Sequence, residues 1–277
     1  KIAVGKKYKE LGDLLQGIFL LQECSLRSLD AVMSFGEQLS AYIISEAIKT
    51  RGVACHFLDT RTLIKTDNNF GEANVDMQKT YEQTAHAITD DIPLAIMGGF
   101  IGSTDNNIPT TLGRGGSDYT ASLVGAALKA EVIEIWTDVD GVFTADPHKI
   151  TDAFPLAEIR YDEAGELAHF GAKVIHPKTM HPAKLQNIPI LIKNTFHPKA
   201  KGTIISNKNK KRKFQIQAIS ALSNVALLHI QFANEKNIRA MLARLFDALG
   251  RDHVETLLIT QASYEPALSI AVHNDEA

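Results

Sequence analysis

The sequence has few cysteines, no excess of basic charge and no long apolar run, which argues against several classes of protein. Only two of its 277 residues are cysteines, Cys24 and Cys55, and this indicates free thiols in a reducing compartment. The formal net charge is −3, whereas a nucleic-acid-binding protein normally has a basic surface. No apolar run approaches the ~20 residues of a membrane span, and no signal peptide is visible. We therefore expect a cytoplasmic protein with neither a membrane nor a nucleic-acid partner.

Several common site motifs are absent too. No Walker A motif occurs, and the dinucleotide fingerprint G-x-G-x-x-G fails because Asp118 stands where its last glycine would be. A dehydrogenase is therefore excluded within this chain. His176 and His181 have no cysteine or acidic cluster near them, so we expect no zinc site. An EF-hand at residues 137–147 is excluded because the later acidic positions are out of register.

Length and composition favour a globular α/β protein with a small appendage. Hydrophobic residues make up 45% and charged residues 22%. The basic run NKNKKRK at residues 207–213 indicates a solvated linker rather than a nucleic-acid patch. We place the domain boundary there, with one domain at 1–206 and a second at 207–277. The second domain is predicted to contain a strand, a helix and two strands, about half of a ferredoxin-like domain, at 225–232, 237–249, 256–260 and 267–272.

The chain is organised around a glycine-rich segment, TTLGRGGSDYTA at residues 110–121. Its glycines let the backbone approach a ligand closely, and Arg114 adds a planar set of donors for an oxyanion. Ser117 or Asp118 is expected to cap the helix that follows. The N-terminus of that helix suits a phosphate or a carboxylate. The alternative is an ordinary glycine-rich turn with an N-cap.

Two further loops follow apolar strands. The strand at 94–97 ends in Gly98 and Gly99, and ligands in open α/β sheets bind beyond the carboxyl ends of strands. The strand at 132–136 runs into TDVDGVFTADP at residues 137–147. This loop is either an Asp-Gly turn or a nucleotide pocket whose hydroxyl and carboxylate groups take the ribose, an amine or Mg²⁺.

Two single residues have both a structural and a functional interpretation. Glu37 is expected in the first turn of a helix that ends near Gly52, where a carboxylate is favourable for the helix dipole alone. Lys173 follows a glycine turn, from which a long cation reaches a phosphate, although a lone lysine is usually a solvated surface charge.

Several blocks of sequence together resemble one family, the aspartokinases of the amino acid kinase superfamily. They are SFGE at 34–37, TLGRGGSDYTA at 111–121, and WTDVDGVFTADP at 136–147 with FGAKVIHP at 170–177. The match runs from about residue 14 to residue 206 and looks closest to the kinase part of bifunctional aspartokinase–homoserine dehydrogenases. The resemblance implies an amino acid kinase-like three-layer αβα sandwich. The βαββ tail resembles the first part of an ACT regulatory domain.

The resemblance implies ATP-dependent phosphorylation of the L-aspartate side-chain carboxylate to 4-phospho-L-aspartate, with ATP and Mg²⁺ as cofactors. This is the first step toward lysine, threonine, methionine and isoleucine. The implied catalytic residues are Asp118 and Lys173. The implied substrate-binding residues are Ser34, Glu37, Arg114, Ser117 and Asp118, of which Glu37 takes the amino group and Arg114 the α-carboxylate. The implied nucleotide-binding residues are Gly98, Gly99, Thr137, Asp138, Phe143, Asp146, His148 and Lys173.

The chemistry agrees with this assignment, because a carboxylate nucleophile is already ionised near neutral pH and needs no general base. Phosphoryl transfer depends mainly on positioning and charge neutralisation, which glycine amides and cations supply. Two positions depart from the family pattern. Phe143 replaces a common tyrosine and loses a hydroxyl, and His148 replaces a common arginine and loses a permanent cation.

The resemblance also implies regulation and assembly. We expect a feedback amino acid, threonine or lysine, and a homo-oligomer formed through the ACT domain. Two alternatives remain open. One is another acid kinase, for glutamate or acetylglutamate, and the other is a non-catalytic sensor that binds an amino acid or a nucleotide.

One departure generates a prediction about this sequence by itself. The family opens with a strand carrying Lys-Phe-Gly-Gly-Thr-Ser, whose lysine touches the transferring phosphate, and no such motif occurs here. The sequence begins with Lys1, and we interpret it as a fragment of a longer aspartokinase. We predict that these 277 residues alone are inactive. ATP- and aspartate-dependent turnover in a coupled ADP-release assay would contradict this.

Overall fold

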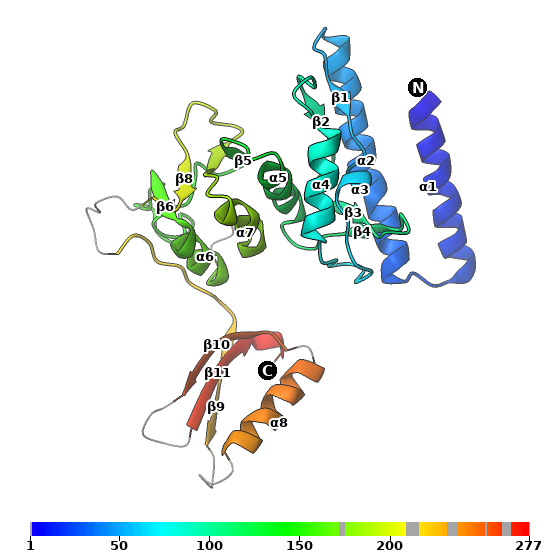
Figure 1. Cartoon of the computed structure of the whole chain (residues 1–277). Helices are drawn as coiled ribbons and strands as arrows, with labels where there is room; N and C mark the ends of the chain where they lie inside the picture. Colours follow the sequence, from blue (N-terminus) through cyan, green and yellow to red (C-terminus); the bar gives the residue numbers. More distant parts are fainter. Residues whose placement is uncertain are drawn as a thin grey trace.

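The computed structural model of the chain describes residues 2–171, 175–208, 216–231, 238–252, 254–261 and 267–276. Its helices and strands form three groups in chain order, which Figure 1 shows in colours from blue to red. No helix within these ranges is long and apolar enough to span a membrane.

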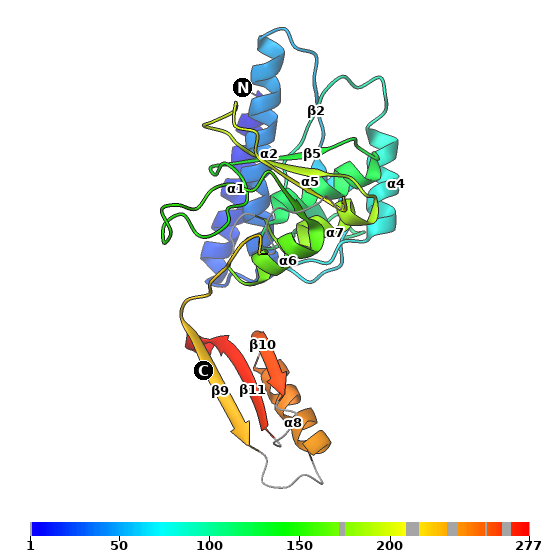
Figure 2. The same cartoon turned by 90° about the vertical axis from the view of Figure 1, so that its left-hand side faces the viewer.

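The first group contains helices α1 to α4 and two small sheets. The helices are α1 (Ile2–Leu21), α2 (Leu26–Thr50), α3 (Thr60–Leu63) and α4 (Met77–Ala87). The strands are β1 (His56–Phe57), parallel to β2 (Ala95–Ile96), and β3 (Ile101–Ser103), antiparallel to β4 (Pro109–Thr111). Helix α1 packs along α2 (Figures 1 and 2), and α2 contacts β4. The long helix α2 therefore lies beside the strand that leads into the glycine-rich segment.

Helix α2 begins earlier than the sequence predicted. Ser25 is its N-cap, and the Ser25 hydroxyl accepts a hydrogen bond from the Ser28 backbone N–H at 3.2 Å. A serine is favoured there because it satisfies an otherwise unpaired N–H group. Glu37 lies in the middle of α2, so the prediction that it occupies a first turn is wrong. Since the helix dipole acts on charges in the terminal turns, it does not account for a carboxylate at this position.

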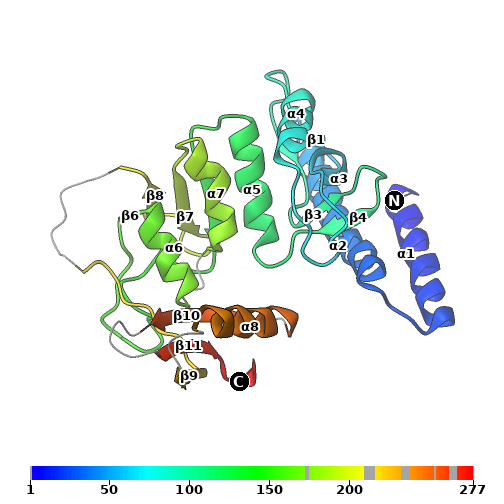
Figure 3. The same ribbon diagram turned by 60° about the horizontal axis from the view of Figure 1, so that its bottom comes forward.

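The second group is a four-stranded sheet with helices packed on one face. The strands lie in the order β5 (Ile133–Thr137), β7 (Ile190–Asn194), β8 (Thr203–Ser206) and β6 (Glu158–Arg160). β5 and β7 are parallel, β8 is antiparallel to β7, and β6 is parallel to β8. The helices are α5 (Gly116–Ala127), α6 (Tyr161–His169) and α7 (Pro177–Leu185) (Figure 3).

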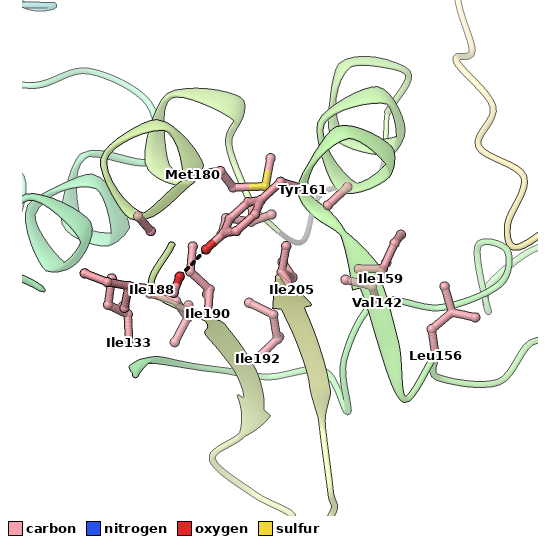
Figure 4. Close-up of a cluster of buried hydrophobic side chains, with 14 residues drawn as sticks. Ile133, Val142, Leu156, Ile159, Tyr161, Met180, Ile188, Ile190, Ile192 and Ile205 are labelled. Atoms are coloured by element: carbon pink, nitrogen blue, oxygen red, sulfur yellow. Dashed lines mark hydrogen bonds between the residues drawn. The ribbon is translucent and has the colours of Figure 1, made fainter. Parts of the chain in front are cut away.

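An isoleucine-rich core fills the space between this sheet and its helices (Figure 4). Alternate residues of a strand point to the same face, so every second residue of β5 and β7 enters the core. Tyr161 at the start of α6 is also buried, and its hydroxyl donates a hydrogen bond to the carbonyl of Ile188. Burial raises the pKa of Tyr161 far above its usual value, which keeps this donor protonated. The buried core residues are Ile133, Ile135, Val142, Leu156, Ile159, Tyr161, Ala164, Ile175, Met180, Ala183, Ile188, Ile190, Ile192 and Ile205.

Helix α5 links the first two groups. It packs against α7 on one side and against α4 on the other, and Figure 3 shows it between these helices. Gly125 sits at the contact with β5, where an added Cβ would lie 2.6 Å from Cγ1 of Ile133. The N-terminus of α5, where the glycine-rich segment ends, therefore lies at the junction of the two groups.

The third group contains β9 (Val225–Gln231), α8 (Ile238–Arg251), β10 (Thr256–Gln261), β11 (Ala267–His273) and a short 3₁₀ helix (Asn274–Glu276). The order strand, helix, strand, strand agrees with the sequence prediction. The strands form an antiparallel sheet in the order β10-β11-β9, and α8 packs on it through Leu242 and Leu245 (Figure 2). His169 of α6 lies with Nε2 3.2 Å from the carbonyl oxygen of Leu257 in β10. The assignment of this group to an ACT domain stays a prediction.

Replacing Tyr161 with phenylalanine should lower the free energy of unfolding by about 1–3 kcal/mol, because the buried Ile188 carbonyl loses its hydroxyl donor. Urea unfolding followed by circular dichroism measures this change. The control is Tyr8→Phe in α1, where the tyrosine is 58% exposed. It should change the free energy of unfolding by no more than about 0.5 kcal/mol. Equal effects of the two substitutions would show that the buried hydrogen bond contributes nothing.

Candidate functional site

Two glycines beyond β2 bring α2 and α5 together. A Cβ added to Gly98 would lie 2.9 Å from the backbone oxygen of Glu37, and one added to Gly99 would lie 2.7 Å from Cα of Ser117. Only glycine permits such a close approach. Thr60 holds the same segment, since its Oγ1 donates to the carbonyl of Gly98 at 2.5 Å. Glu37 and Ser117 therefore flank one short stretch of backbone. A nucleotide-binding role for the two glycines stays a prediction.

The glycine-rich segment makes a tight turn into α5. Gly113 and Gly115 have φ angles of 74° and 69°, in the left-handed region that glycine adopts at little cost. A Cβ on Gly115 would lie 2.7 Å from Cβ of His176. Gly115 is the N-cap of α5 and has no side-chain cap, so the prediction that Ser117 or Asp118 caps this helix is wrong. Both residues lie within the first turn instead. The N–H groups of that turn have no side-chain cap and suit an anionic ligand.

Charged side chains lie on both sides of this turn. Arg114 is exposed, and Asp118 is half-buried in the first turn of α5. Burial raises the pKa of Asp118 above its usual value, because the ionised carboxylate loses hydration. An exposed guanidinium beside a helix N-terminus suits a carboxylate or a phosphate. A carboxyl group with a shifted pKa next to such a site is a candidate functional residue.

Glu72 and Lys178, which the sequence did not single out, support the turn together with His176. A Cβ on Gly113 would lie 2.9 Å from Cγ of Glu72, whose carboxylate forms an ion pair with Lys178 in α7. His176 caps α7, with Nδ1 accepting from the Lys178 backbone N–H at 3.2 Å. Burial, followed by the charges of Lys178 and Arg114, lowers the pKa of His176. The ring is therefore neutral at neutral pH, as this acceptor role requires.

The two candidates on α2 differ in their surroundings. Ser34 is fully buried, and its hydroxyl donates to the Ala31 carbonyl at 2.8 Å. The same oxygen accepts from Nε2 of Gln38 at 3.1 Å. The Ser34 hydroxyl is thus used inside the helix, and this geometry gives no support to a substrate contact. Glu37 is half-buried beside Gly98.

The predicted nucleotide residues Thr137 and Asp138 lie where β5 ends. Thr137 Oγ1 donates to Oδ1 of Asp138 at 3.1 Å. Asn194, at the end of the neighbouring parallel strand β7, donates through Nδ2 to the Asp138 carbonyl at 3.3 Å and to Oδ1 of Asp140 at 2.7 Å. Its own Oδ1 accepts from the Phe196 backbone N–H at 2.8 Å. Asn194 therefore joins two loops at the carboxyl edge of the sheet, where α/β proteins bind ligands.

The remaining nucleotide candidates lie further along the same loop. Asp146 and His148 are exposed, and Oδ1 of Asp146 accepts from the His148 backbone N–H at 2.9 Å. This is the usual turn-forming role of an aspartate. Phe143 is half-buried, and its backbone pairs with Pro155. Contacts between these three residues and a nucleotide stay predictions.

Lys173 lies outside the described residues. Within the described ranges, no three or more His, Cys, Asp or Glu side chains gather in a way that could hold a metal ion.

The site residues form two groups. The first contains Glu37, Ser117 and the two glycines between them, with Arg114 and Asp118 at the start of α5. The second contains Thr137 and Asp138, held by Asn194. The sequence offered a signal for Asn194, because this polar residue directly follows an apolar strand, as Thr137 does. It offered none for Glu72, which is close to the turn only in the folded chain.

Replacing Asn194 with aspartate should weaken nucleotide binding about tenfold, because a carboxylate would face the Asp140 carboxylate and the Asp138 carbonyl with no proton to share. The aspartate still offers an oxygen to the Phe196 N–H, so the substitution disturbs the loop after β5 and spares the loop after β7. Titration with ADP, followed by the fluorescence of the single tryptophan, Trp136, measures the affinity.

The matched control is Asn207→Asp, which removes an exposed amide that donates to Asn187 at 2.7 Å. This variant should bind ADP as the unmodified chain does. Equal ADP affinity in the Asn194 variant and the control would contradict a role of Asn194 in holding this loop.

Comparison with known proteins agrees with these motifs. The model of the amino acid kinase family matches residues 3–194. A bifunctional aspartokinase/homoserine dehydrogenase of Buchnera aphidicola is 34% identical over 274 residues, which are 99% of this chain and 34% of that protein. Lysine-sensitive aspartokinase 3 of Escherichia coli is 36% identical over 269 residues, 95% of this chain and 60% of that protein.

The fold comparison gives the same result. The crystal structure of E. coli aspartokinase III in complex with aspartate and ADP matches with a TM-score of 0.82 and 34% identity, covering 98% of this chain and 61% of that one. The chain thus spans between about a third and three-fifths of the length of these relatives. The predicted α/β class and the resemblance to aspartokinases are confirmed. The chain belongs to the amino acid kinase family.

Proposed function

We propose that this protein binds L-aspartate and ATP and belongs to an enzyme that phosphorylates the side-chain carboxylate of L-aspartate, giving 4-phospho-L-aspartate and ADP. The observation that carries the proposal is the close packing of Gly98 and Gly99 against Glu37 and Ser117. This packing has the backbone of Glu37 on one side of the segment and the start of α5, which follows Arg114, on the other. An amino acid requires such a pair, an anion for its ammonium group and a cation for its α-carboxylate.

The relatives support the choice of substrate. The solved structure of E. coli aspartokinase III contains aspartate and ADP, and the curated relatives are named aspartokinases. In the proposed reaction, one oxygen of the aspartate side chain attacks the γ-phosphorus of ATP, and the bond to the β–γ bridging oxygen breaks. No base is required, because the attacking carboxylate is ionised near neutral pH.

Each group of residues has a part in this proposal. Arg114 and the N-terminal N–H groups of α5 hold the α-carboxylate, and Glu37 holds the ammonium group. Ser117 and Asp118 lie beside the reacting end. Asp118 is half-buried there, and burial raises the pKa of its carboxyl group. Thr137 and Asp138 contact the nucleotide, which arrives with Mg²⁺, and Lys173 approaches its phosphates. Magnesium spreads the charge of the transferring phosphoryl group.

Regulation and assembly belong to the same proposal. The relative in E. coli is named lysine-sensitive. We extend this to the present protein as feedback by an amino acid, lysine or threonine, acting on residues 207–277. The sheet of β9, β10 and β11 is the proposed site of homo-oligomer formation. A cytoplasmic location also stays part of the proposal.

Ligand binding tests this proposal. It requires no catalytic turnover, which we do not expect from a sequence without the Lys-Phe-Gly-Gly motif. In calorimetric titrations with Mg²⁺ and ADP present, the chain should bind L-aspartate more tightly than L-glutamate or N-acetyl-L-glutamate. Arg114→Lys should weaken L-aspartate binding about tenfold, because an ammonium cannot match the carboxylate bidentately. It should leave ADP affinity within about twofold.

The control is Arg239→Lys, at an exposed position in α8, which should change neither affinity. Tighter binding of glutamate or acetylglutamate would replace the proposal with a different acid kinase. Binding of ADP without any of the three acids would indicate a nucleotide-binding sensor instead.

A further inference from the structure

Asp30 is a buried carboxylate that the site described above does not include. It lies in α2, seven residues before Glu37, and its exposed fraction is 0%. Among the described residues it forms no ion pair. Leaving an ionised carboxylate without partners in a protein interior is costly, so its hydrogen bonds indicate what keeps it there.

Two backbone N–H groups and one hydroxyl surround this carboxylate. Oδ2 accepts from the Gly71 N–H at 2.9 Å and from the Thr111 N–H at 3.0 Å. Oδ1 accepts from the Thr111 hydroxyl at 2.7 Å. The same hydroxyl lies 3.2 Å from the Gly71 carbonyl oxygen. Asp30 therefore fastens two segments that are 40 residues apart in the chain to one point on α2.

Both fastened segments lead directly into the turn before α5. Thr111 is the last residue of β4, two positions before Gly113. Gly71 precedes Glu72, whose Cγ is the atom that a Cβ on Gly113 would meet at 2.9 Å. The Glu72 carboxylate also forms an ion pair with Lys178, which connects this loop to α7. The carboxylate of Asp30 thus holds both sides of the turn that carries Arg114.

The same helix carries Glu37 at the opposite side of the proposed ligand site. Asp30 and Glu37 are two helical turns apart, so they lie on similar sides of α2. Glu37 packs against Gly98, and Gly99 packs against Ser117. A shift of the β4 end relative to α2 would change the spacing between Glu37 and Arg114. Gly98 and Gly99 alone do not fix that spacing, because the close contacts of Gly98 are with Glu37 and those of Gly99 are with Ser117, which follows the turn.

We propose that Asp30 is a positioning residue that sets the separation of Glu37 and Arg114 and thereby the affinity for an amino acid. It does this by holding the Gly71 and Thr111 backbones against α2. It touches no ligand itself. The inference rests on the proposed function, because it assigns the two ends of an amino acid to Glu37 and Arg114.

The decisive substitution is Asp30→Asn, which keeps the size of the side chain, removes the negative charge that strengthens all three hydrogen bonds, and leaves an NH₂ group that only donates where a carboxylate oxygen accepted. L-aspartate affinity, measured by calorimetry with Mg²⁺ and ADP present, should fall at least about tenfold. ADP affinity should stay within about twofold, because Thr137 and Asp138 lie at the end of β5, which belongs to another sheet than β4. Equal losses for both ligands, or no loss for L-aspartate, would overturn the inference.

Asp67 offers a chemically matched control. Its carboxylate also accepts two backbone N–H groups, from Asn69 at 3.1 Å and Asn74 at 2.9 Å, and one side-chain donor, Asn74 Nδ2, at 2.8 Å. It lies in the same loop as Gly71 but makes no bond to α2 or β4 in the described residues. Asp67→Asn should leave both affinities within about twofold. An equal loss of L-aspartate affinity in Asp67→Asn and in Asp30→Asn would show that Asp30 only stabilises the loop in general. That result would overturn the inference.

A second pair of variants covers the case in which Asp30→Asn does not fold. Thr111→Val removes the hydroxyl that contacts Asp30 and the Gly71 carbonyl, and Thr111→Ser keeps it. The valine variant should lose L-aspartate affinity and the serine variant should retain it. Equal behaviour of the two would overturn the inference.

Hydrogen exchange separates this inference from the proposed function. In Asp30→Asn, or in Thr111→Val where that variant is used, the amides of Gly71 and of residues 113–116 should exchange at least about tenfold faster than in the unmodified chain. If the unmodified chain binds no L-aspartate, the proposed function fails, and this exchange measurement still decides whether the carboxylate holds the turn. Unchanged exchange at residues 113–116 would then overturn the inference.

Discussion

Close approach of backbone to backbone at glycine is the constraint on which this structure depends. Gly98 and Gly99 leave no room for a Cβ between the carbonyl of Glu37 and the start of α5. A side chain at either position would push α2 and α5 apart, and with them the two groups of elements that meet at α5. These two glycines therefore set how closely α2 and α5 approach, and Gly113 and Gly115 allow the turn that carries Arg114.

Buried polar groups then determine how the loops are attached. Asn194 uses both ends of its amide to join the loops after β5 and β7, and Asp30 uses both carboxylate oxygens to join α2, β4 and the Gly71 loop. Such groups are stable in the interior only when they are hydrogen-bonded, so each accepts or donates to a specific backbone segment. This is how a site built from loops obtains a defined geometry from a rigid scaffold.

Local patterns predicted much of the fold. The apolar run that became β5 was recognisable, and its isoleucines enter the core. The order strand, helix, strand, strand at the C-terminal end was also predicted. The three-residue strands β3, β4 and β6 were missed, since so short a strand shows no periodicity in the sequence. The glycine-rich turn before α5 was predicted, but the cap of α5 was not, because a left-handed glycine occupies the position expected for a capping side chain.

The sequence by itself determined where the glycine turns lie, which strands fill the sheet core and which family motifs occur, because each of these is encoded within a dozen consecutive residues. Only the tertiary structure decided the orientation of α2. Its polar residues Asp30, Ser34, Gln38 and Ser45 are buried, while Leu26 and Ile43 are largely exposed. A polar stripe on a helix ordinarily indicates the solvent side. Here it faces inward, because Asp30 accepts from N–H and hydroxyl groups of the strand and loop packed against α2, and Gln38 accepts from Lys7 of α1. These partners are far away in the sequence, whereas Ser34 and Ser45 donate to carbonyls of their own helix.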